Sequence, residues 1–526
     1  MSSQSLRLAA IAGPRNPLAS FRWTSIPLEI RLLILQSVIT ECRGIKQAAH
    51  GQKSTSLASL ASVCKDWQAL FERHTFRRLD LDDKDLMSFA NLTGGKNIAR
   101  LDYIRQLWLR IELSAYTCLS CHKQEAESTI IKNRLIFKSS FTLLLHVLSR
   151  WTPNRDGGLT LEISAHSPSD TEHYYRNLLD FDRQKHFHLE EDLQRSPGLV
   201  EYTRQRQAEL NSRKNRHRLR LTLGAAQRFQ GAALALNSWR PLPVTPIVKG
   251  LCLRPHFFRG IALRTLGKIF RDSFINMTSF RFERWTSVDF REEYVFFLEF
   301  LEVLIHAFPH RLKVFSFNQW AKWEGCHRSI PETLHINPLL IQAVVTSYYK
   351  LTDLCPPWQL STQQFLTELG RAGTRPCEKP NLELLCLEFR SLHPAKGQGY
   401  FTDILVLAAK AATAMPKLRT LEIWNAGPGY GFLFRYTLHP HQATVTWRST
   451  QKAIALEPGT IEAWMKVASD HEVQLLVEME PFHGAEQEGM IVDGKIMYRH
   501  LVLARLAIHP VTLAHFEAER TLRETS

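Results

Sequence analysis

Cys118, Cys121 and His122 form the densest group of reactive side chains in the sequence, in the segment "CLSCH". This spacing matches a c-type haem attachment site and supplies part of a tetrahedral zinc site. Haem attachment requires export, which nothing in the sequence indicates, and zinc requires two further ligands. The sequence has no second CxxC, and the Cys326-His327 pair is far away along the chain. We therefore interpret Cys118 and Cys121 as a structural pair, and we expect no metal and no cofactor.

Other catalytic signatures are absent from the sequence. It contains no HExxH, Walker or GxSxG motif. The glycines of "NAGPGYG", Asn425 to Gly431, are not followed by the Lys-Ser/Thr pair of a phosphate-binding loop, so this segment predicts a tight turn. We therefore expect a protein that is not an enzyme and has no catalytic residue.

The positive charge of the chain is unevenly distributed. The formal net charge is +15, and Arg204 to Arg220 alone holds seven Lys or Arg against one Glu. Such a run is usually a solvated surface, with a nuclear localisation signal and nucleic-acid binding as alternatives. Because no aromatic residues are interleaved for base stacking, the pattern does not favour nucleic acid.

Length and composition limit the class of protein. A chain of 526 residues with 44% hydrophobic content predicts two or more domains, or a repeat array. No run of about 18 apolar residues occurs, so we expect no transmembrane helix and no membrane partner. Residues 1–20 lack the features of a secretory signal and are expected to be a flexible N-terminus. Nine scattered cysteines are typical of reduced thiols, which indicates the cytoplasm, the nucleus or both.

Two helices are predicted within residues 21–81, and both have more than one apolar side. The first opens at Pro27 and Glu29, and residues 44–56 after it predict a loop. The second, "SLASLASVCKDWQALF" from Ser56 to Phe71, is apolar over most of its circumference. Such a helix must be buried on several sides. Periodicity alone favours two core helices of a larger fold, whereas the order of the motifs favours a docking module.

The order "IPLEIRLLIL", "LASLASVCKDWQALF", "FRRLDL" resembles the F-box motif. That family has a Pro and an acidic residue at the start of the first helix, a Leu/Ile run, then Val-Cys-Lys/Arg-x-Trp and an apolar-rich exit. The resemblance covers roughly the first 80 residues, and the connection from Val38 to Leu57 is longer than the family usually has. The matching positions are Pro27, Glu29, Ile30, Leu33, Ile34, Val63, Cys64, Lys65, Trp67, Leu70 and Phe76.

The resemblance implies that residues 21–81 are a small helical F-box. In that family the F-box binds a Skp-family adaptor, which connects it to a cullin–RING ubiquitin ligase. One side of the second helix would then pack within the module and another would meet the adaptor, with apolar burial as the main attraction. The adaptor contacts that the resemblance implies are Ile26, Pro27, Leu28, Ile30, Leu33, Ile34, Val63 and Trp67.

A strand pattern with apolar residues at alternate positions recurs after the F-box. Start-to-start spacings of 29, 35 and 36 residues occur, and a degenerate unit near "YYKLTDLC" would divide the longest gap. Helix-like segments, such as 292–308 and 400–416, lie between the strands. The strand patterns are "IRQLWLRIEL" from Ile104, "GLTLEIS" from Gly158, "VKGLCLRP" from Val248, "MTSFRFERW" from Met277, "LKVFSFNQW" from Leu312, "LELLCLEF" from Leu382 and "LRTLEIW" from Leu418.

We therefore predict an α/β fold class. An N-terminal helical F-box would be followed by an irregular leucine-rich-repeat-like solenoid over residues 82–429, with a basic excursion near 166–247. An ordinary α/β domain with uneven connections is the alternative. Residues 430–526 predict a small C-terminal α+β cap, in which "GTIEAWMKVAS" is a helix and "ATVTWRS", "EVQLLVEMEPF" and "GKIMYRHLVLARLAI" are strands.

The whole chain resembles filamentous-fungal F-box proteins, notably in "RIELSAYTCLSC" and "LTLEISAHSPSDTEHYY". Trp285, Trp320, Trp323 and Trp424 lie near strand ends and either line a recognition surface or pack between repeats. The function implied is a non-catalytic substrate-recognition subunit of an SCF-type cullin–RING ubiquitin ligase. Its partners would be a Skp-family adaptor, through it a cullin, and an unknown target protein. The alternatives are an F-box/repeat scaffold without ligase function and a nucleic-acid-associated protein.

Overall fold

The chain divides into two compact units, residues 1–77 and residues 78–526, here called the N-terminal unit and the sheet unit. The computed structural model describes residues 23–48, 57–151, 158–170, 204, 223–287, 289–320, 338–357, 360–373, 380–390, 392–451, 453–480, 482 and 494–525. The predicted flexible N-terminus, residues 1–20, lies outside them, as does all of the basic segment except Arg204.

The N-terminal unit consists of one long helix, α1 (Leu28–Ala48), and three shorter helices, η1 (Trp23–Ser25), α2 (Leu57–Leu60) and α3 (Lys65–Thr75). Its buried core consists of Leu35, Ile39 and Phe71, with further apolar side chains packed around them. The predicted loop therefore starts too early, because α1 continues through Gly44 to Ala48.

The single helix predicted over residues 56–71 is also wrong. The chain leaves helical geometry at Cys64, whose φ of −161° and ψ of 174° are extended, and Cys64 is the N-cap of α3. Ser62 holds the preceding turn, since its hydroxyl donates to the carbonyl of Ser59 at 2.7 Å. Asp66 in the first turn of α3 suits the positive end of the helix dipole. The break places Val63 in a turn.

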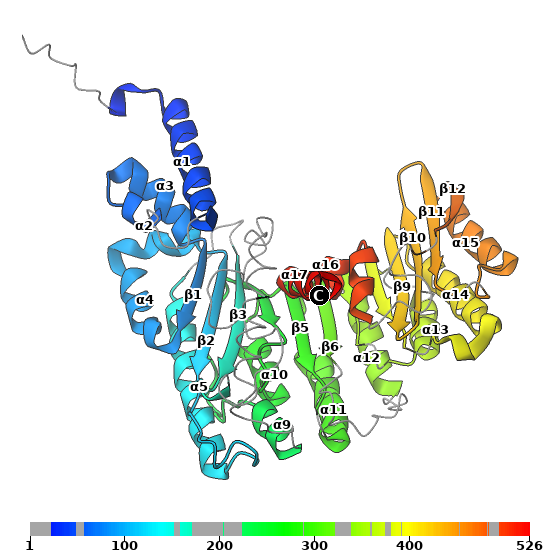
Figure 1. Ribbon diagram of the computed structural model, residues 1–526, viewed down its shortest axis with the longest axis horizontal. Helices are drawn as coiled ribbons and strands as arrows, with labels where there is room; N and C mark the ends of the chain where they lie inside the picture. Colours follow the sequence, from blue (N-terminus) through cyan, green and yellow to red (C-terminus); the bar gives the residue numbers. More distant parts are fainter. Residues whose placement is uncertain are drawn as a thin grey trace, which may run out of the picture. The chain divides into compact units, whose positions relative to one another are not determined.

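Within the described residues, twelve strands form one sheet whose spatial order is the order of the sequence (Figure 1). Strands β1 to β9 are all parallel, β10 is antiparallel to both β9 and β11, and β12 is parallel to β11. The strands are β1 (Arg78–Asp82), β2 (Gln106–Glu112), β3 (Leu159–His166), β4 (Val248–Leu253), β5 (Ser279–Trp285), β6 (Val314–Trp320), β7 (Asp353–Cys355), β8 (Leu384–Glu388), β9 (Thr420–Gly427), β10 (Tyr430–Leu438), β11 (Gln442–Ser449) and β12 (Gln474–Met479).

The predicted α/β class is confirmed, and so is every strand predicted between residues 104 and 427, including the degenerate unit that becomes β7. One strand was not foreseen. Residues 78–81, assigned from the sequence to the end of the F-box, belong to β1 and pair with β2. The Gly/Pro turn is also confirmed, because Gly429 has a φ of 80° between β9 and β10.

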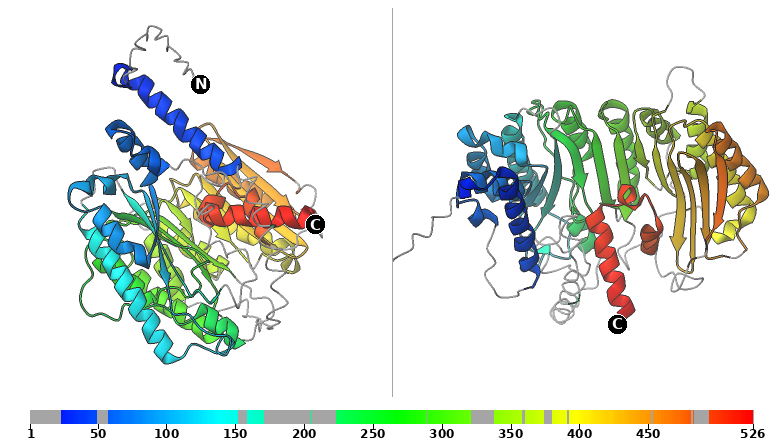
Figure 2. Two further views of the ribbon diagram at one scale, coloured as in Figure 1. Left: turned by 60° about the vertical axis from the view of Figure 1, so that its left-hand side comes forward. Right: turned by 90° about the horizontal axis from the view of Figure 1, so that it is seen from above.

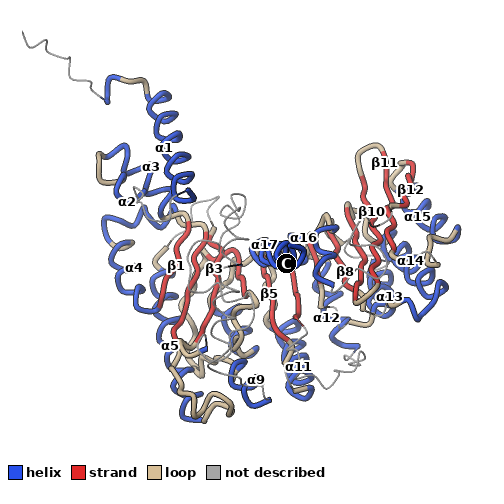
Figure 3. Tube along the Cα trace, viewed as in Figure 1, coloured by secondary structure: helices blue, strands red, loops and turns tan. Residues whose placement is uncertain are grey.

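Helices connect the parallel strands, and Figure 3 shows the alternation of the two element types. Consecutive helices from α10 to α15 pack against one another. No helix in the described ranges is long and apolar enough to span a membrane. The helices are α4 (Leu86–Leu92), α5 (Glu127–Ser149), α9 (Leu223–Gln230), α10 (Leu263–Asp272), α11 (Phe290–His306), α12 (Pro338–Tyr348), α13 (Thr362–Gly373), α14 (Gly397–Thr413), α15 (Pro458–Asp470), α16 (Ala504–Ala507) and α17 (Pro510–Thr525), with short 3-10 turns η2 (Asp83–Asp85), η3 (Gly95–Tyr103), η5 (Pro394–Lys396) and η7 (Gly494–His500).

One face of the sheet is apolar and packs against these helices. Phe280 and Phe315 stack in neighbouring strands, and Phe300 of α11 lies 6.3 Å from Phe315 between ring centroids. Trp464 of α15 is fully buried against Phe434 of β10. The register forms one continuous apolar row across the sheet: Leu79, Leu107, Leu161, Leu251, Phe280, Phe315, Leu354, Leu385, Leu421, Tyr436, Val445 and Val477.

The same hydrogen-bond pattern recurs just before successive strands. The N–H groups of Thr352 and Asp353 both donate to the carbonyl of Lys313. Those of Glu383 and Leu384 donate to Thr352 in the same way. This pair of bonds also precedes β6 and β9, with the carbonyls of Thr278 and Glu383 as acceptors. Each connection thus returns the chain to an equivalent position beside the preceding strand.

The C-terminal residues do not form a separate cap. β10 pairs with β9 from Tyr430 to Thr437, so residues after 430 continue the same sheet. The helix predicted at "GTIEAWMKVAS" is confirmed as α15, and β11 and β12 are the first two predicted strands. The third, "GKIMYRHLVLARLAI", is not a strand: it forms η7 and α16. Its alternating apolar residues pack across other strands instead of joining their ladder, so tertiary contacts override the local pattern.

Candidate functional site

The N-terminal unit exposes large apolar side chains along its first helix. The exposed fraction is 66% for Leu33, 54% for Leu28 and 46% for Ile30. In the turn before α3, Val63 is 59% exposed. Four exposed apolar residues in so small a region are more than scattered surface hydrophobics, and they mark a surface that another molecule could cover. We call Leu28, Ile30, Leu32, Leu33, Ile34 and Val63 the apolar surface.

Helix geometry explains why α1 has apolar residues on two sides. At about 100° per residue, Leu35 and Ile39 lie on one stripe, which is the buried one. Leu33 and Ile30 lie well over 90° away from that stripe by the same geometry. The second apolar side of the predicted helix therefore has no partner within the described part of the N-terminal unit.

Two of the eight residues predicted to contact the adaptor are partly buried. Trp67 is partly buried and packs against the core of its own unit, with its ring centroid 5.9 Å from Trp23 and 5.4 Å from Phe71. Ile26 is half-buried. The other six are exposed: Pro27, Leu28, Ile30, Leu33, Ile34 and Val63. Trp67 thus holds α3 against the rest of the unit, in which the side chain of Arg31 also pairs with Asp66.

The second face of the sheet is polar, which is unusual for parallel strands because these are normally apolar on both sides. Neighbouring strands place charged and hydroxyl side chains side by side along it. We call this the polar face. One row of it, adjacent along each strand to the apolar row, reads Asp80, Trp108, Glu162, Cys252, Arg281, Ser316, Cys355, Cys386, Glu422, Arg435, Thr446 and Glu478.

Charges on β3 and β4 are paired within the polar face. Glu162 and Arg254 form a buried ion pair at 2.5 Å, and His256 lies 3.3 Å from the same carboxylate. Burial alone would raise the pKa of Glu162, but Arg254 and His256 hold it at about 2. Trp108 lies under the Arg254 guanidinium, 5.2 Å from its ring centroid. The carboxylate of Glu162 therefore has two partners within the same chain.

The chain's own C-terminal residues cover the middle of the polar face. We call residues 494–525 the strap; it comprises η7, α16 and α17. Figure 2 shows α17 on the opposite side of the sheet from α10 and α11. Glu422 accepts hydrogen bonds from the main-chain N–H groups of Val502 at 2.9 Å and Leu503 at 2.8 Å. Arg435 donates to Glu422 at 2.7 Å and also to the carbonyl of His500.

Further bonds hold the strap over β5 and β6. Ser316 donates to the carbonyl of Leu506 at 2.6 Å, and Asn318 donates to that of Ala507 at 3.1 Å. Glu283 is fully buried and accepts from the N–H of His509. Burial raises the pKa of Glu283, although Arg281 beside it acts in the opposite direction.

An apolar cluster lies beneath the strap. Trp320 of β6 and Trp424 of β9 are buried in it, and Tyr498 of the strap packs against both rings. Trp285 packs at its edge and donates from its ring nitrogen to the carbonyl of Pro255. Of the four tryptophans considered from the sequence, Trp323 lies outside the described residues. The other three pack inside the protein, and two of them form the floor of the strap's binding surface.

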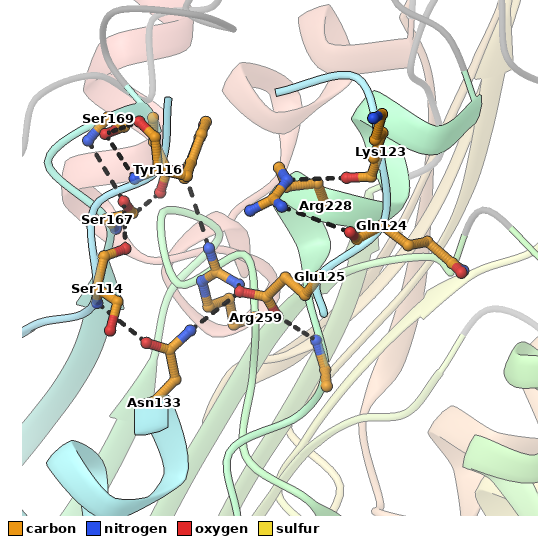
Figure 4. Close-up of polar contacts among 12 residues, drawn as sticks. Ser114, Tyr116, Lys123, Gln124, Glu125, Asn133, Ser167, Ser169, Arg228 and Arg259 are labelled. Carbon is orange, nitrogen blue, oxygen red and sulfur yellow. Dashed lines mark hydrogen bonds and ion pairs between the residues drawn. The ribbon is translucent and has the colours of Figure 1, made fainter. Parts of the chain in front are cut away.

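A second polar network joins the loops that follow β2, β3 and β4 (Figure 4). Glu125 pairs with Arg259 at 2.5 Å and accepts from Asn133 at 3.0 Å. Tyr116 donates to Asp170 at 2.9 Å, and burial raises the pKa of that carboxyl. Arg228 and Ser169 extend the network, which is built from loops far apart in sequence. Its oppositely charged groups are paired, so it serves to fix these loops.

The thiols predicted to be a structural pair lie next to this network. Cys118 is exposed and Cys121 is buried. The Cys121 thiol donates to the carbonyl of Cys118 at 3.1 Å. Among the described residues, no group of three or more His, Cys, Asp or Glu side chains could hold a metal ion.

Comparison with known proteins adds one likeness. Residues 307–509 match a family of unknown function (DUF6546). No curated protein matches the chain. The matched range runs from the end of α11 through the strap to His509, whose N–H binds Glu283. The likeness thus includes both the covered strands from β6 onward and the first half of the strap, up to the residue before α17.

Sequence reasoning missed the polar face and the strap. A signal for the first was present, because β2, β3, β5, β6, β8, β9 and β10 each carry Arg, Glu or Asn between apolar residues, where a two-sided parallel sheet would be apolar throughout. A signal for the strap is weaker. Residues 494–512 contain Lys495, Arg499 and Arg505 but no acidic residue, which complements Glu283 and Glu422.

Proposed function

We propose that this protein is a non-catalytic substrate-recognition subunit of an SCF-type cullin–RING ubiquitin ligase. The N-terminal unit is an F-box that docks onto a Skp-family adaptor through the apolar surface, and the sheet unit holds a target protein. The ligase partners then supply the chemistry, and this chain contributes proximity. The observation that carries the proposal is the exposure of apolar side chains at F-box motif positions, with Leu33 at 66% and Val63 at 59%.

The exposed residues coincide with the motif in a specific way. Leu28, Ile30, Leu33 and Ile34 combine an F-box-like sequence with large exposed area, whereas Leu35 and Ile39 of the same helix form the core. A helix that exposed these side chains to water permanently would lose hydrophobic stabilisation of about 25 cal/mol for each Å² left uncovered. Coverage by an adaptor removes that cost and accounts for both apolar sides of α1.

The sheet unit supports the second half of the proposal. Nine sequential parallel strands, with the same pair of main-chain hydrogen bonds before each of β6 to β9, are the features of an irregular leucine-rich-repeat-like solenoid. Asn425 adds a repeat-like contact, since its amide donates to the carbonyl of Leu392 beside the preceding strand at 2.8 Å. Such arrays present one extended sheet face, which is suited to holding another polypeptide.

An adaptor-binding measurement tests the proposal. Purified full-length protein is immobilised, and retention of a recombinant Skp-family adaptor is measured for the wild type and for Leu33→Ala combined with Val63→Ala. Both side chains are exposed, so the variant keeps its fold while losing contact area. We expect retention to fall at least about tenfold, because two buried anchor residues typically contribute 1 to 2 kcal/mol each.

Met87→Ala is the matched control, since Met87 is 60% exposed but lies on α4 of the sheet unit. It should retain the adaptor as the wild type does. Equal retention by the double variant and the wild type would remove the adaptor from the proposal. A wild type that retains no adaptor would leave the scaffold function without ligase assembly as the better account.

A further inference from the structure

The hydrogen bonds between the polar face and the strap involve mainly the main chain of the strap. Most of them run from sheet side chains to main-chain groups of the strap: Arg435 and Glu422 bind at residues 500–503, Ser316 and Asn318 at residues 506–507, and Glu283 at residue 509. Main-chain N–H and C=O groups are common to every polypeptide. The polar face therefore binds the strap largely as a peptide, in a way that does not depend on the strap's side chains.

The face is also selective in charge and size. Glu283 and Glu422 are almost fully buried on it, and the strap residues 494–512 hold three Lys or Arg and no acidic residue. Between the polar bonds, Tyr498 and Ile508 fill the apolar cluster with Trp320 and Trp424. A ligand of this face is thus a polypeptide segment that lacks acidic residues, offers main-chain N–H groups to the two carboxylates and supplies a few large apolar side chains.

We propose that the polar face is a peptide-binding surface and that the strap is its resident ligand, which a target segment of the same chemistry displaces. This inference rests on the proposed function, in which the sheet unit binds a target protein. The strap then competes with a segment of that target for the polar face. A tethered ligand acts at an effective concentration in the millimolar range, so a free peptide binds the wild type only weakly. Loosening the strap should raise the apparent affinity for a free peptide.

The test uses a fluorescein-labelled synthetic peptide of residues 494–512 and the full-length chain, with binding followed by fluorescence anisotropy. The strap is loosened by Ile508→Asp, which places a carboxylate in the apolar cluster. Hydrogen exchange of the strap amides verifies the loosening, and Leu506→Asp is added if Ile508→Asp alone leaves these amides protected. We expect the loosened variant to bind the peptide at least about tenfold more tightly than the wild type.

Two controls define the surface and the ligand chemistry. Adding Glu283→Gln and Glu422→Gln to the loosened variant should return binding to the wild-type level, because both acceptors of main-chain N–H groups are weakened. A peptide with its Lys and Arg replaced by Glu should not bind. Circular dichroism of each variant checks that the sheet is intact.

The inference is overturned by a loosened strap that brings no gain in peptide binding. Strap amides that stay protected even with both aspartates would equally overturn it, because the strap would then be a permanent part of the fold. Neither result affects the adaptor-binding measurement, which depends on Leu33 and Val63 in the other unit. Conversely, peptide binding without adaptor retention would remove the ligase function and leave the peptide-binding surface.

Discussion

The N-terminal unit and the sheet unit differ in how their side chains are covered. The sheet unit has one apolar face under its helices and one polar face whose middle is covered by the strap. The N-terminal unit buries a core around Leu35, Ile39 and Phe71, and five large apolar side chains of α1 stay exposed: Leu28, Ile30, Leu32, Leu33 and Ile34. The difference lies in what covers each surface: a segment of the same chain covers the middle of the polar face, whereas these side chains of α1 remain exposed.

Core substitutions should affect the two units separately and by the largest amount. Phe317→Ala in β6 and Phe71→Ala in α3 each remove a ring that is at most 1% exposed, at an expected cost of about 3–5 kcal/mol. Thermal unfolding followed by circular dichroism should show Phe317→Ala lowering the main transition. Phe71→Ala should unfold only the N-terminal unit, because a core this small has little stability to lose. A single transition shifted equally by both substitutions would break the comparison.

Weakening the hydrogen bonds that Glu422 makes to the strap should lower the free energy of unfolding by less than the core substitutions do. Glu422→Gln replaces a buried carboxylate that binds Arg435 and two main-chain N–H groups, with an expected loss of about 1.5–3 kcal/mol in the free energy of unfolding by urea. Glu388→Gln is the control, because Glu388 pairs at 3.1 Å with Arg390, which is partly exposed. Its cost should stay below about 1 kcal/mol. Equal losses in the two variants would mean that the strap adds nothing to the stability of the sheet unit.

Acidification should weaken the sheet unit through a histidine of the strap. Burial, followed by Arg499, Arg448 and Arg435, lowers the pKa of His500 from 6.5 to about 4. The unfolded chain therefore binds a proton that the folded chain resists, so the stability contributed by neutral His500 is complete above the unfolded value and is lost as pH falls toward the folded one. Buried Glu283, whose pKa is raised, acts in the opposite direction.

The measurement compares the wild type with His500→Gln. Urea unfolding from about pH 7 to about pH 5 should show a smaller loss of stability for the variant than for the wild type. The variant should still lose some stability on acidification, because burial also lowers the pKa of His509 well below its usual range. A larger loss in His500→Gln would contradict the sign of this effect.

The smallest expected effect is that of Leu33→Ala, and its comparison with Leu35→Ala tests most directly which side chains of α1 are covered. Leu33→Ala and Leu35→Ala lie two residues apart on α1, with exposed fractions of 66% and 2%. Leu35→Ala should destabilise the N-terminal unit by about 2–5 kcal/mol, whereas Leu33→Ala should change its stability by less than about 0.5 kcal/mol. A substantial loss of stability in Leu33→Ala would show that the apolar surface is already covered within the chain.

Much of the fold could be predicted from local pattern. The strands from β2 to β9 have apolar residues at alternate positions along most of their length, so period-2 signals such as "LKVFSF" located them correctly. The α2–α3 break could not be predicted, because the apolar periodicity of 56–71 continues across Val63 and Cys64 while the main chain does not. For "GKIMYRHLVLARLAI", alternation predicted a strand, but the segment lies across strands whose side chains bind its main chain, which no local pattern contains.

The candidate site could be predicted only in part, for a related reason. The motif residues of the N-terminal unit were recognisable as a group, yet whether Trp67 or Leu33 faces outward depends on how α3 packs against Trp23. The polar face depends on the register between strands that are distant in sequence. Arg281 and Ser316 become neighbours only through the pairing of β5 with β6. Local sequence shows that these residues alternate, and only the assembled sheet shows that they form one row.

The position of the strap in the sequence sets an order of events during synthesis. Arg281 binds the carbonyl of Leu506, which is 225 residues later in the chain. A ribosome adds about 5–20 residues per second, so β5 and its neighbours are made roughly ten seconds or more before the segment that covers them. During that interval Glu283, Trp320 and Glu422 face the cell without their final partner. The nascent chain therefore passes through a stage in which its polar face is open, and this is the stage at which chaperones or premature ligands have access to it.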